Sequence, residues 1–268
     1  MKSENIAVLG VPFDGYSTYL RGAAKAPGKI LESLHCDSSN LWTENGIDLG
    51  GRTDWETVGD VDIKDDKTAF SKIEDRVGSL LKDKSRVITL GGDHSITYPI
   101  VRAYAGAYPE LNILHLDAHP DLYEELGGIR HSHACPFARI MENNLASKLV
   151  QAGIRTLNGH QKEQAERFKV EIIDMKNIES AMDLSFDGPV YLSIDLDCLD
   201  PAFAPGVSHH EPGGMSTRQV LTLIQTLDAD LVGADIVEYN PDRDLNGVTG
   251  MVAAKLLKEI LARMMENN

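Results

Sequence analysis

Short runs of apolar residues alternate with stretches of helical periodicity along almost the whole chain. The runs span four to seven residues with few polar interruptions, which is typical of strands buried on both faces of a sheet. The expected strands are residues 6–11, 86–90, 112–116, 149–154, 170–173, 190–195 and 231–237.

The segments between these runs repeat their apolar residues every three to four positions, as amphipathic helices do. Residues 68–82 show this spacing in Phe70, Ile73, Val77 and Leu80. The other expected helices are residues 29–34, 95–108, 137–146, 217–227 and 248–265. Repeated alternation of strands and helices predicts an α/β fold, in which residues 1–268 form a single domain with a parallel β-sheet sandwiched by helices in three layers.

Two segments rich in proline and glycine, residues 12–28 and 201–214, are long for connections in a compact α/β domain. Loops of this length usually serve a function. Ligands of parallel sheets bind beyond the carboxyl ends of the strands. We therefore expect the chemistry of this protein at that edge of the sheet.

Composition narrows the choice of partners. The chain has 268 residues, with 26 Lys and Arg against 41 Asp and Glu and a formal net charge of −15. Such a charge argues against nucleic acid as a partner and favours small cationic ligands. No apolar run approaches the roughly 20 residues of a membrane span, and the first residues are too short and too acidic for a signal peptide. With three cysteines and no paired Cys motif, the sequence predicts a cytoplasmic protein.

Residues that can ligate a metal follow three of the expected strands. They are His94 after the strand 86–90, Asp117, His119 and Asp121 after the strand 112–116, and Asp195 and Asp197 at the end of the strand 190–195. Within each group the residues stand at alternate positions, so an extended backbone would place them on one face. Four carboxylates and two imidazoles are thus expected in one site.

Four carboxylates at close range cannot all stay ionised without cations, because their repulsion raises their pKa values. Two divalent ions would balance the four aspartates. Carboxylate and imidazole ligands without thiolate suit Mn²⁺, and suit Zn²⁺ or Ni²⁺ less well. Two such ions about 3.5 Å apart would lower the pKa of a shared water towards 7, which yields a hydroxide nucleophile. The sequence therefore predicts two Mn²⁺ ions per chain.

Three segments resemble the signature segments of the ureohydrolases, the family of the arginases, agmatinases, guanidinobutyrases and formiminoglutamases. They are residues 91–95, 117–121 and 193–197, and the resemblance, closest to plant-type arginases, extends from residue 6 to about residue 264. The resemblance implies an arginase-like fold and a ligand scheme in which Asp117 and Asp195 bridge two manganese ions. His94 and Asp121 would complete the first site, and His119 and Asp197 would complete the second.

The resemblance also implies roles for two residues outside the metal ligands. His133 resembles the family's proton-shuttling histidine, a role that an imidazole can fill near neutral pH, and His131 is its local competitor. Glu238, after the last expected strand, resembles the carboxylate that holds the substrate guanidinium in a planar, paired contact.

Other polar residues near the motifs are expected to play supporting parts. His115 is expected on the opposite face of its strand from the ligands, as a core residue or a ligand support. Asp93 and Ser95 are expected to orient His94. His209 and His210 could line the mouth of the site without being ligands.

The resemblance implies a binuclear manganese hydrolase that cleaves a small cationic guanidino compound to urea and an amine, with L-arginine favoured. Agmatine or another guanidino acid is the alternative substrate. Arg130 could pair with the α-carboxylate of arginine, whereas Glu124 and Glu125 could attract the ammonium of agmatine. Asn158 stands where animal arginases carry an aspartate that binds the α-amino group.

Two functions of other classes stay open at this point. One is a single-zinc deacetylase of the same fold, in which His94 would have no purpose. The other is a metal-binding protein without turnover. The resemblance further implies a homo-oligomer, either a trimer or a hexamer.

Overall fold

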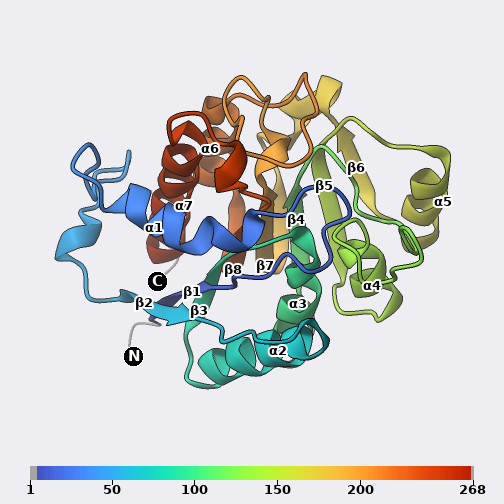
Figure 1. Ribbon diagram of the computed structural model, residues 1–268, viewed down its shortest axis with the longest axis horizontal. Coiled ribbons are helices and arrows are strands. Elements are labelled where there is room, and N and C mark those ends of the chain that lie inside the picture. Colours follow the sequence, from blue (N-terminus) through green and yellow to red (C-terminus); the bar gives the residue numbers. More distant parts are fainter. Residues whose placement is uncertain (1–4, 267–268) are drawn as a thin grey trace.

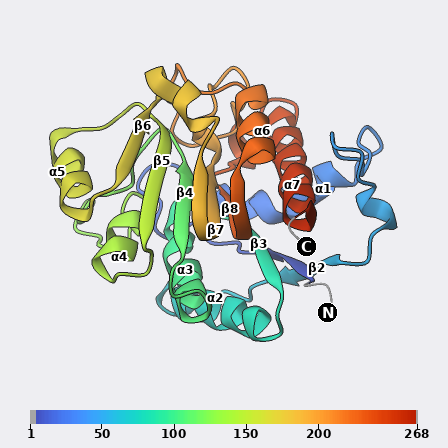
Figure 2. The same ribbon diagram turned by 180° about the vertical axis from the view of Figure 1, so that it is seen from behind.

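Eight parallel strands form one sheet in the order β2-β1-β3-β8-β7-β4-β5-β6 (Figures 1 and 2). The computed structural model describes residues 5–266. The strands are β1 (Ile6–Gly10), β2 (Trp55–Asp60), β3 (Arg86–Leu90), β4 (Asn112–Leu116), β5 (Lys148–Ile154), β6 (Glu171–Asp174), β7 (Ser185–Asp195) and β8 (Asp228–Val237). All seven predicted strands are present, and the predicted parallel sheet is confirmed.

Helices cover both faces of this sheet, which gives the three layers visible in Figure 1. On one face lie α1 (Ala26–Leu34), α6 (Thr217–Thr226) and α7 (Val248–Glu266). On the other lie α2 (Asp66–Lys82), α3 (Thr97–Ala107), α4 (Pro136–Glu142) and α5 (Gly159–Phe168). Among the helices of residues 5–266, none combines the length and the apolar character that crossing a membrane requires.

Each central strand supplies side chains to two separate apolar cores. In β1, Ile6 and Val8 belong to the core beneath α1, α6 and α7, whereas Ala7 and Leu9 belong to the core beneath α2 and α3. All four side chains are buried. Alternation of strand side chains between two covered faces is why these strands appear in the sequence as continuous apolar runs.

The strand that the sequence analysis missed is β2, at the edge of the sheet. Only Trp55 and Val58 of its six residues are half-buried, and the others are exposed. Its hydrogen bonds to β1 therefore form without an apolar run. A second difference is the end of α4, which stops at Glu142 instead of continuing to residue 146, because Asn144 adopts a left-handed conformation with φ of 53°.

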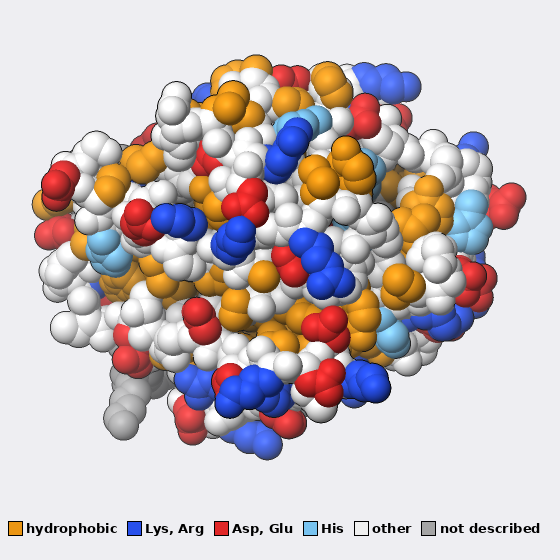
Figure 3. Space-filling model, viewed as in Figure 1, with side chains coloured by type: hydrophobic (Ala, Val, Ile, Leu, Met, Phe, Trp, Pro, Cys, Tyr) orange, Lys and Arg blue, Asp and Glu red, His pale blue; other side chains and the backbone are white. Residues whose placement is uncertain are grey.

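The surface carries interspersed charges. On the face shown in Figure 3, Lys and Arg side chains lie among Asp and Glu side chains, and small apolar groups are scattered between them. Tyr19, Trp42 and Leu245 are among the large apolar side chains that remain exposed.

Tyr104 of α3 contacts the two neighbouring strands β3 and β8. Its hydroxyl donates to the carbonyl of Val87 in β3 at 3.0 Å and accepts from the Val87 N–H at 3.1 Å. Gly233 of β8 makes room for the ring, because a Cβ atom there would lie 2.2 Å from the Tyr104 hydroxyl oxygen. The ring thus occupies the space that a side chain at position 233 would need.

We expect Gly233→Ala to destabilise the protein by about 1–3 kcal/mol, the usual effect of overpacking a core. Gly78→Ala in α2 is the matched control, because a Cβ atom there meets nothing within 4 Å. An alanine inside a helix stabilises by roughly 0.5–1 kcal/mol relative to glycine. Urea unfolding monitored by circular dichroism measures both changes, and a Gly233→Ala protein as stable as the wild type would contradict the packing described here.

Candidate active site

Four neighbouring strands, β3, β8, β7 and β4, bring the candidate residues to one edge of the sheet. His94 follows β3, Glu238 follows β8, Asp195 ends β7, and Asp117 follows β4. Because these strands are parallel, their carboxyl ends meet at the same edge. The structure thereby gathers all six predicted ligands, since His94 and His119 each lie close to aspartates of the set.

His94 stands at the centre of the first group. Its Nδ1 atom is 3.3 Å from Asp117 Oδ2, 3.1 Å from Asp121 Oδ2 and 3.3 Å from Asp195 Oδ2. The side chain is fully buried, and Nδ1 has no hydrogen-bond partner with acceptable geometry among the described residues. A buried nitrogen of this kind needs an explanation, and a bound cation supplies one.

The opposite nitrogen of His94 fixes the tautomer. Ser193 donates its hydroxyl proton to Asp235 Oδ1 at 2.7 Å, so its oxygen is free to accept from His94 Nε2 at 3.0 Å. The Nε2 atom therefore carries a proton, and in the neutral ring the lone pair of Nδ1 points at the three carboxylates. These residues fit a metal ion at this position.

His119 forms the second group with two aspartates. Its Nδ1 atom is 2.9 Å from Asp197 Oδ2 and 3.5 Å from Asp117 Oδ1. Ligand atoms of the three residues all lie within 4.8 Å of one another, a spacing that could hold a metal ion. Asp117 thus presents one oxygen to each group, as expected of a residue between two cations.

The local backbone differs from the expectation that Asp117, His119 and Asp121 share a face of an extended strand. Strand β4 ends at Leu116, and Asp121 has a left-handed φ of 48°. The Asp117 Oδ1 atom accepts the N–H of His119 at 2.6 Å, which is a turn closed by an aspartate side chain. This turn brings Asp117, His119 and Asp121 into one site.

Burial and mutual repulsion shape the charges of the site. Burial, together with Asp197 and Asp117, raises the pKa of Asp195 well above its usual range. Burial and Asp117 raise the pKa of Asp197 to about 7. Burial alone would lower the pKa of His119, but Asp197 and Asp117 outweigh it and raise that pKa to about 12. The cluster thus favours added positive charge, which bound metal ions would also provide.

His115 lies on the same face as Asp117, which corrects the expectation of the opposite face, since residues two apart in a strand share a face. The side-chain amide of Gln151 donates to His115 Nδ1 at 3.0 Å, so the proton of the neutral ring lies on Nε2. His115 Nε2 then donates to Asp117 Oδ2 at 2.8 Å. Although His94, His115 and Asp117 are close enough to hold a metal, this arrangement makes His115 a support for Asp117.

Asp93 and Ser95 do not orient the His94 ring, contrary to expectation. Asp93 accepts the Ser95 N–H at 3.1 Å and the Tyr16 N–H at 3.0 Å. It therefore holds the loop of residues 12–22 against the sheet. The sequence analysis missed the true partner, Ser193, because a serine two positions before Asp195 carries no distinctive signal.

A cavity of about 180 Å³ opens above the two groups. Its walls include His119, Asp121, Asp195 and Asp197, and its floor lies over the buried His94 and Asp117. Thr18, Tyr123, Gln161 and His209 also line the cavity. Such a volume admits a small, slender ligand.

Glu238 and His133 both line this cavity and lie side by side. The Glu238 Oε1 atom accepts the N–H of His94 at 2.8 Å and lies 3.4 Å from His133 Nδ1. Burial alone would lower the pKa of His133, but the Glu238 carboxylate outweighs it and raises that pKa to about 9. Glu238 adopts a left-handed φ of 63°, the kind of strained backbone that concentrates at functional sites.

The surroundings of His133 differ from those of His131, the other candidate for the proton-shuttling role. His133 Nε2 lies 2.9 Å from the hydroxyl of Thr18, a contact that the sequence analysis missed although Thr18 belongs to a loop expected to be functional. His131 instead stacks on Tyr98, with ring centroids 5.5 Å apart, and does not line the cavity. His209 does line it and stacks on His133 at 5.0 Å.

Besides Glu238, two further residues, Arg130 and Asn158, were predicted to bind the substrate, and they occupy different places. Arg130 is not brought to the cavity: it is exposed and pairs with Glu142 at 3.1 Å, because the turn at residues 126–129 directs it towards α4. Asn158 caps α5 by accepting the N–H of Gln161 at 2.9 Å. Its amide donates to the Tyr123 hydroxyl at 2.5 Å, so it supports the rim of the cavity.

Comparisons with known proteins point to one family. A model of the arginase family matches residues 4–262. The chain is 45% identical to "Arginase 1, mitochondrial" of Arabidopsis thaliana, over 96% of this chain and 80% of the plant protein. It is 43% identical to "Arginase 2, chloroplastic/mitochondrial" of the same plant, with the same coverage. The solved structure of the arginase from Medicago truncatula has a TM-score of 0.92 and 44% identity, over 98% of this chain and 88% of that one.

These relatives also correct one prediction. Their names place them in mitochondria or chloroplasts, which contradicts the prediction of a cytoplasmic protein. The family model and the plant relatives both cover nearly the whole chain. The chain therefore belongs to the arginase family, the ureohydrolases that its signature segments resemble.

Proposed function

We propose that this protein is a binuclear manganese hydrolase that converts L-arginine to ornithine and urea. The observation that carries the proposal is the His94 Nδ1 atom, which lies 3.1–3.3 Å from three aspartate oxygens and has no hydrogen-bond partner among the described residues. The plant relatives named arginases support arginine as the substrate.

The metal ligands follow the two groups of the site. His94, Asp117, Asp121 and Asp195 would hold one ion, and Asp117, His119, Asp195 and Asp197 would hold the other. The donor set of carboxylates and imidazoles without thiolate favours Mn²⁺. When bound, the ions supply a hydroxide nucleophile near neutral pH and stabilise the negative charge that develops in the transition state.

Glu238 would hold the substrate. The N–H of His94 positions its carboxylate at 2.8 Å, and the same carboxylate keeps its charge because His133 and His94 outweigh burial and lower its pKa. A carboxylate binds a guanidinium through two parallel hydrogen bonds, which fixes the plane of the reacting carbon.

His133 would deliver the proton that the leaving group needs. Its imidazolium donates a proton to the departing nitrogen as the carbon–nitrogen bond breaks, so that ornithine leaves as an amine and urea remains. The Thr18 hydroxyl at 2.9 Å holds the ring in place for this transfer. The Glu238 carboxylate raises the pKa of His133 to about 9, and this pKa would be lower with dications bound nearby.

Agmatine is the second candidate substrate, because no Lys or Arg among the described residues lines the cavity beside Glu238 to meet a carboxylate. The single-zinc deacetylase is less consistent with the structure, since His94 has three carboxylate neighbours and a fixed tautomer. We also propose a homo-oligomer, a trimer or a hexamer, on the resemblance alone.

Urea release after manganese loading tests the substrate. We expect L-arginine to give a higher kcat/KM than agmatine or 4-guanidinobutyrate, with ornithine as the second product. A preference for agmatine would make the protein an agmatinase. One zinc per chain without urea would favour the deacetylase, and bound metal without any turnover would favour a binding protein.

Asp195→Ala tests the metal centre. The wild type should bind two manganese ions per chain, and the variant should lose both metal affinity and turnover, because a carboxylate shared by two dications is removed. Asp187→Asn, exposed on the same strand, is the control. Elemental analysis and urea assays provide the readouts, and a fully active Asp195→Ala protein would overturn the ligand scheme.

Glu238→Gln and His133→Asn separate binding from proton transfer. Hydrogen bonds to charged groups contribute about 1.5–3 kcal/mol, so Glu238→Gln should lower kcat/KM by roughly 10- to 150-fold at unchanged metal content. His133→Asn should mainly lower kcat. The wild-type kcat should fall as the pH rises above the pKa of the His133 imidazolium, and this limb should vanish in the variant. Loss of metal from Glu238→Gln would mean that Glu238 is a ligand instead.

A further inference from the structure

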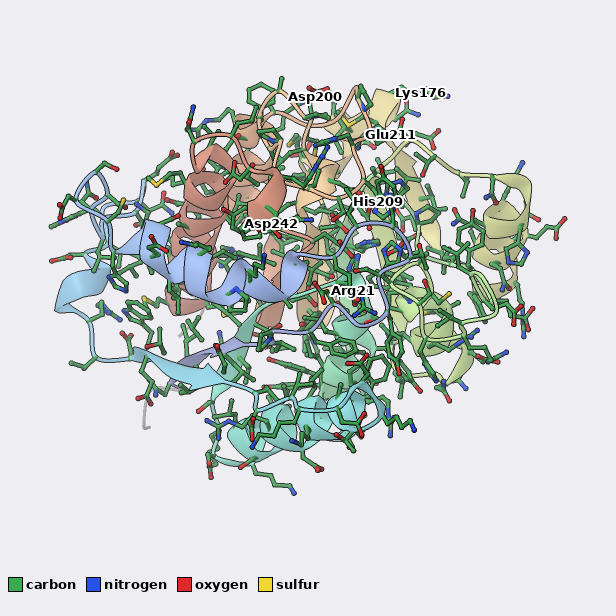
Figure 4. All side chains as sticks on the ribbon, in the orientation of Figure 1. Arg21, Lys176, Asp200, His209, Glu211 and Asp242 are labelled. Atoms are coloured by element: carbon green, nitrogen blue, oxygen red, sulfur yellow. The ribbon has the colours of Figure 1, made fainter. Side chains whose placement is uncertain are left out.

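Asp235 is a fully buried carboxylate that lies behind the candidate metal site. It belongs to β8, two residues before that strand ends at Val237. It does not line the cavity, unlike His209, which Figure 4 labels on the loop beyond the sheet edge. Among residues 5–266, Asp235 forms no ion pair with a Lys, Arg or His side chain. Aspartates are rarely fully buried without such a partner, so this one requires an explanation.

Three hydroxyl groups donate hydrogen bonds to Asp235. Ser193 of β7 lies opposite Asp235 in the pairing of β7 with β8 and donates to its Oδ1 atom at 2.7 Å. Thr97, at the start of α3, and Tyr191 of β7 donate to its Oδ2 atom at 2.8 Å and 2.9 Å. Burial, together with Asp235, raises the pKa of Tyr191 well above its usual range, so the phenol keeps its proton and remains a donor.

The two oxygens of Asp235 therefore have different partners. Because Oδ2 accepts from Thr97 and Tyr191, Oδ1 is left for Ser193. Ser193 gives its only hydroxyl proton to Oδ1, so its oxygen can only accept from His94 Nε2, which lies 3.0 Å away. The proton of the neutral His94 ring thus stays on Nε2, and Nδ1 faces the three carboxylates of the site without a proton.

We propose that Asp235 is a positioning residue, which selects the metal-binding tautomer of His94 through the hydroxyl of Ser193. This inference rests on the metal centre of the proposed function and goes beyond it, because it gives a role to a buried carboxylate outside the ligand set. The alternative is a purely structural role, in which the three hydrogen bonds only join α3 and β7 to β8.

Asp235→Asn tests the proposal, because a carboxamide of nearly the same shape has one accepting oxygen and one donating NH2 group. The oxygen accepts the most hydrogen bonds when it faces Thr97 and Tyr191, which turns the NH2 group towards Ser193. Ser193 then accepts from the amide and gives its own proton to His94 Nε2, so the proton of the neutral ring moves to Nδ1. We expect the affinity for the manganese ion at His94 to fall about 10- to 100-fold, the usual effect of changing a partner of a metal-bound histidine.

Removal of the two competing donors should reverse this effect. In the triple variant Asp235→Asn/Thr97→Val/Tyr191→Phe, the hydroxyl of Ser193 alone remains of the three, and the carboxamide oxygen can turn back towards it. We expect this variant to regain most of the lost manganese affinity, although it has fewer hydrogen bonds than Asp235→Asn. A purely structural role predicts a further loss instead.

Equilibrium dialysis with elemental analysis measures the manganese affinity, and electron paramagnetic resonance distinguishes a coupled pair of Mn²⁺ ions from an isolated ion. Asp235→Asn should give the spectrum of an isolated ion where the wild type gives that of a pair, because the group around His119 is unchanged. Ser193→Ala should weaken the same ion with Asp235 still in place. Asp228→Asn, exposed on the same strand, is the matched control, and circular dichroism verifies that each variant is folded.

Three outcomes would overturn the proposal: wild-type manganese affinity in Asp235→Asn, wild-type affinity in Ser193→Ala, or a larger loss in the triple variant than in Asp235→Asn. Each of them leaves the metal centre of the proposed function intact as long as the wild type binds two ions. Failure of the wild type to bind manganese would contradict the proposed function itself.

Discussion

Four aspartates buried in one pocket are the constraint on which the rest of this site depends. Asp117, Asp121, Asp195 and Asp197 lie at the carboxyl edge of the sheet, where low exposure strengthens their mutual repulsion. The chain offsets this repulsion only in part, through two imidazoles within 3.5 Å of the carboxylates and through backbone N–H groups. Divalent cations would complete the balance, so the same cluster that destabilises a metal-free fold would favour metal binding.

The same turn at the ends of two strands directs carboxylate oxygens towards His94. Asp117 and Asp195 each use one carboxylate oxygen to accept the N–H two residues ahead, at 2.6 Å and 2.8 Å. Each then presents its other oxygen to His94 Nδ1 at 3.3 Å. The Asp-x-His and Asp-x-Asp spacings therefore reflect a turn that fixes one oxygen and aims the other, and an extended strand would not produce this arrangement. Asp121 and Glu238 of the same site adopt left-handed backbone conformations, which are strained for residues other than glycine.

The parts of this structure that could be predicted from sequence are those encoded by nearby residues. Apolar runs predict the buried strands. The candidate metal ligands could be predicted because they stand at or directly after the ends of these runs in the sequence. Strand β2 could not be found because its pairing with β1 uses backbone groups and leaves most side chains exposed. The partners Ser193 and Thr18 could not be found either, because each contacts a histidine about a hundred positions away. Arg130 was misplaced because its direction depends on a turn that carries it towards Glu142.

Predicting the reaction and predicting the substrate also depend on different residues. The residues proposed to act on the guanidinium, Glu238 and His133, lie at the sheet edge beside the proposed metal ligands, and they would treat every guanidine alike. Discrimination between guanidines has to act on the far end of the molecule, which only the outer loops can reach. The positions of those loops depend on contacts between segments that are distant in the chain, since Ser208 bonds to Leu20 and to Asn240. For this reason the signature segments predict the reaction class, whereas residues outside the signatures would select among guanidines.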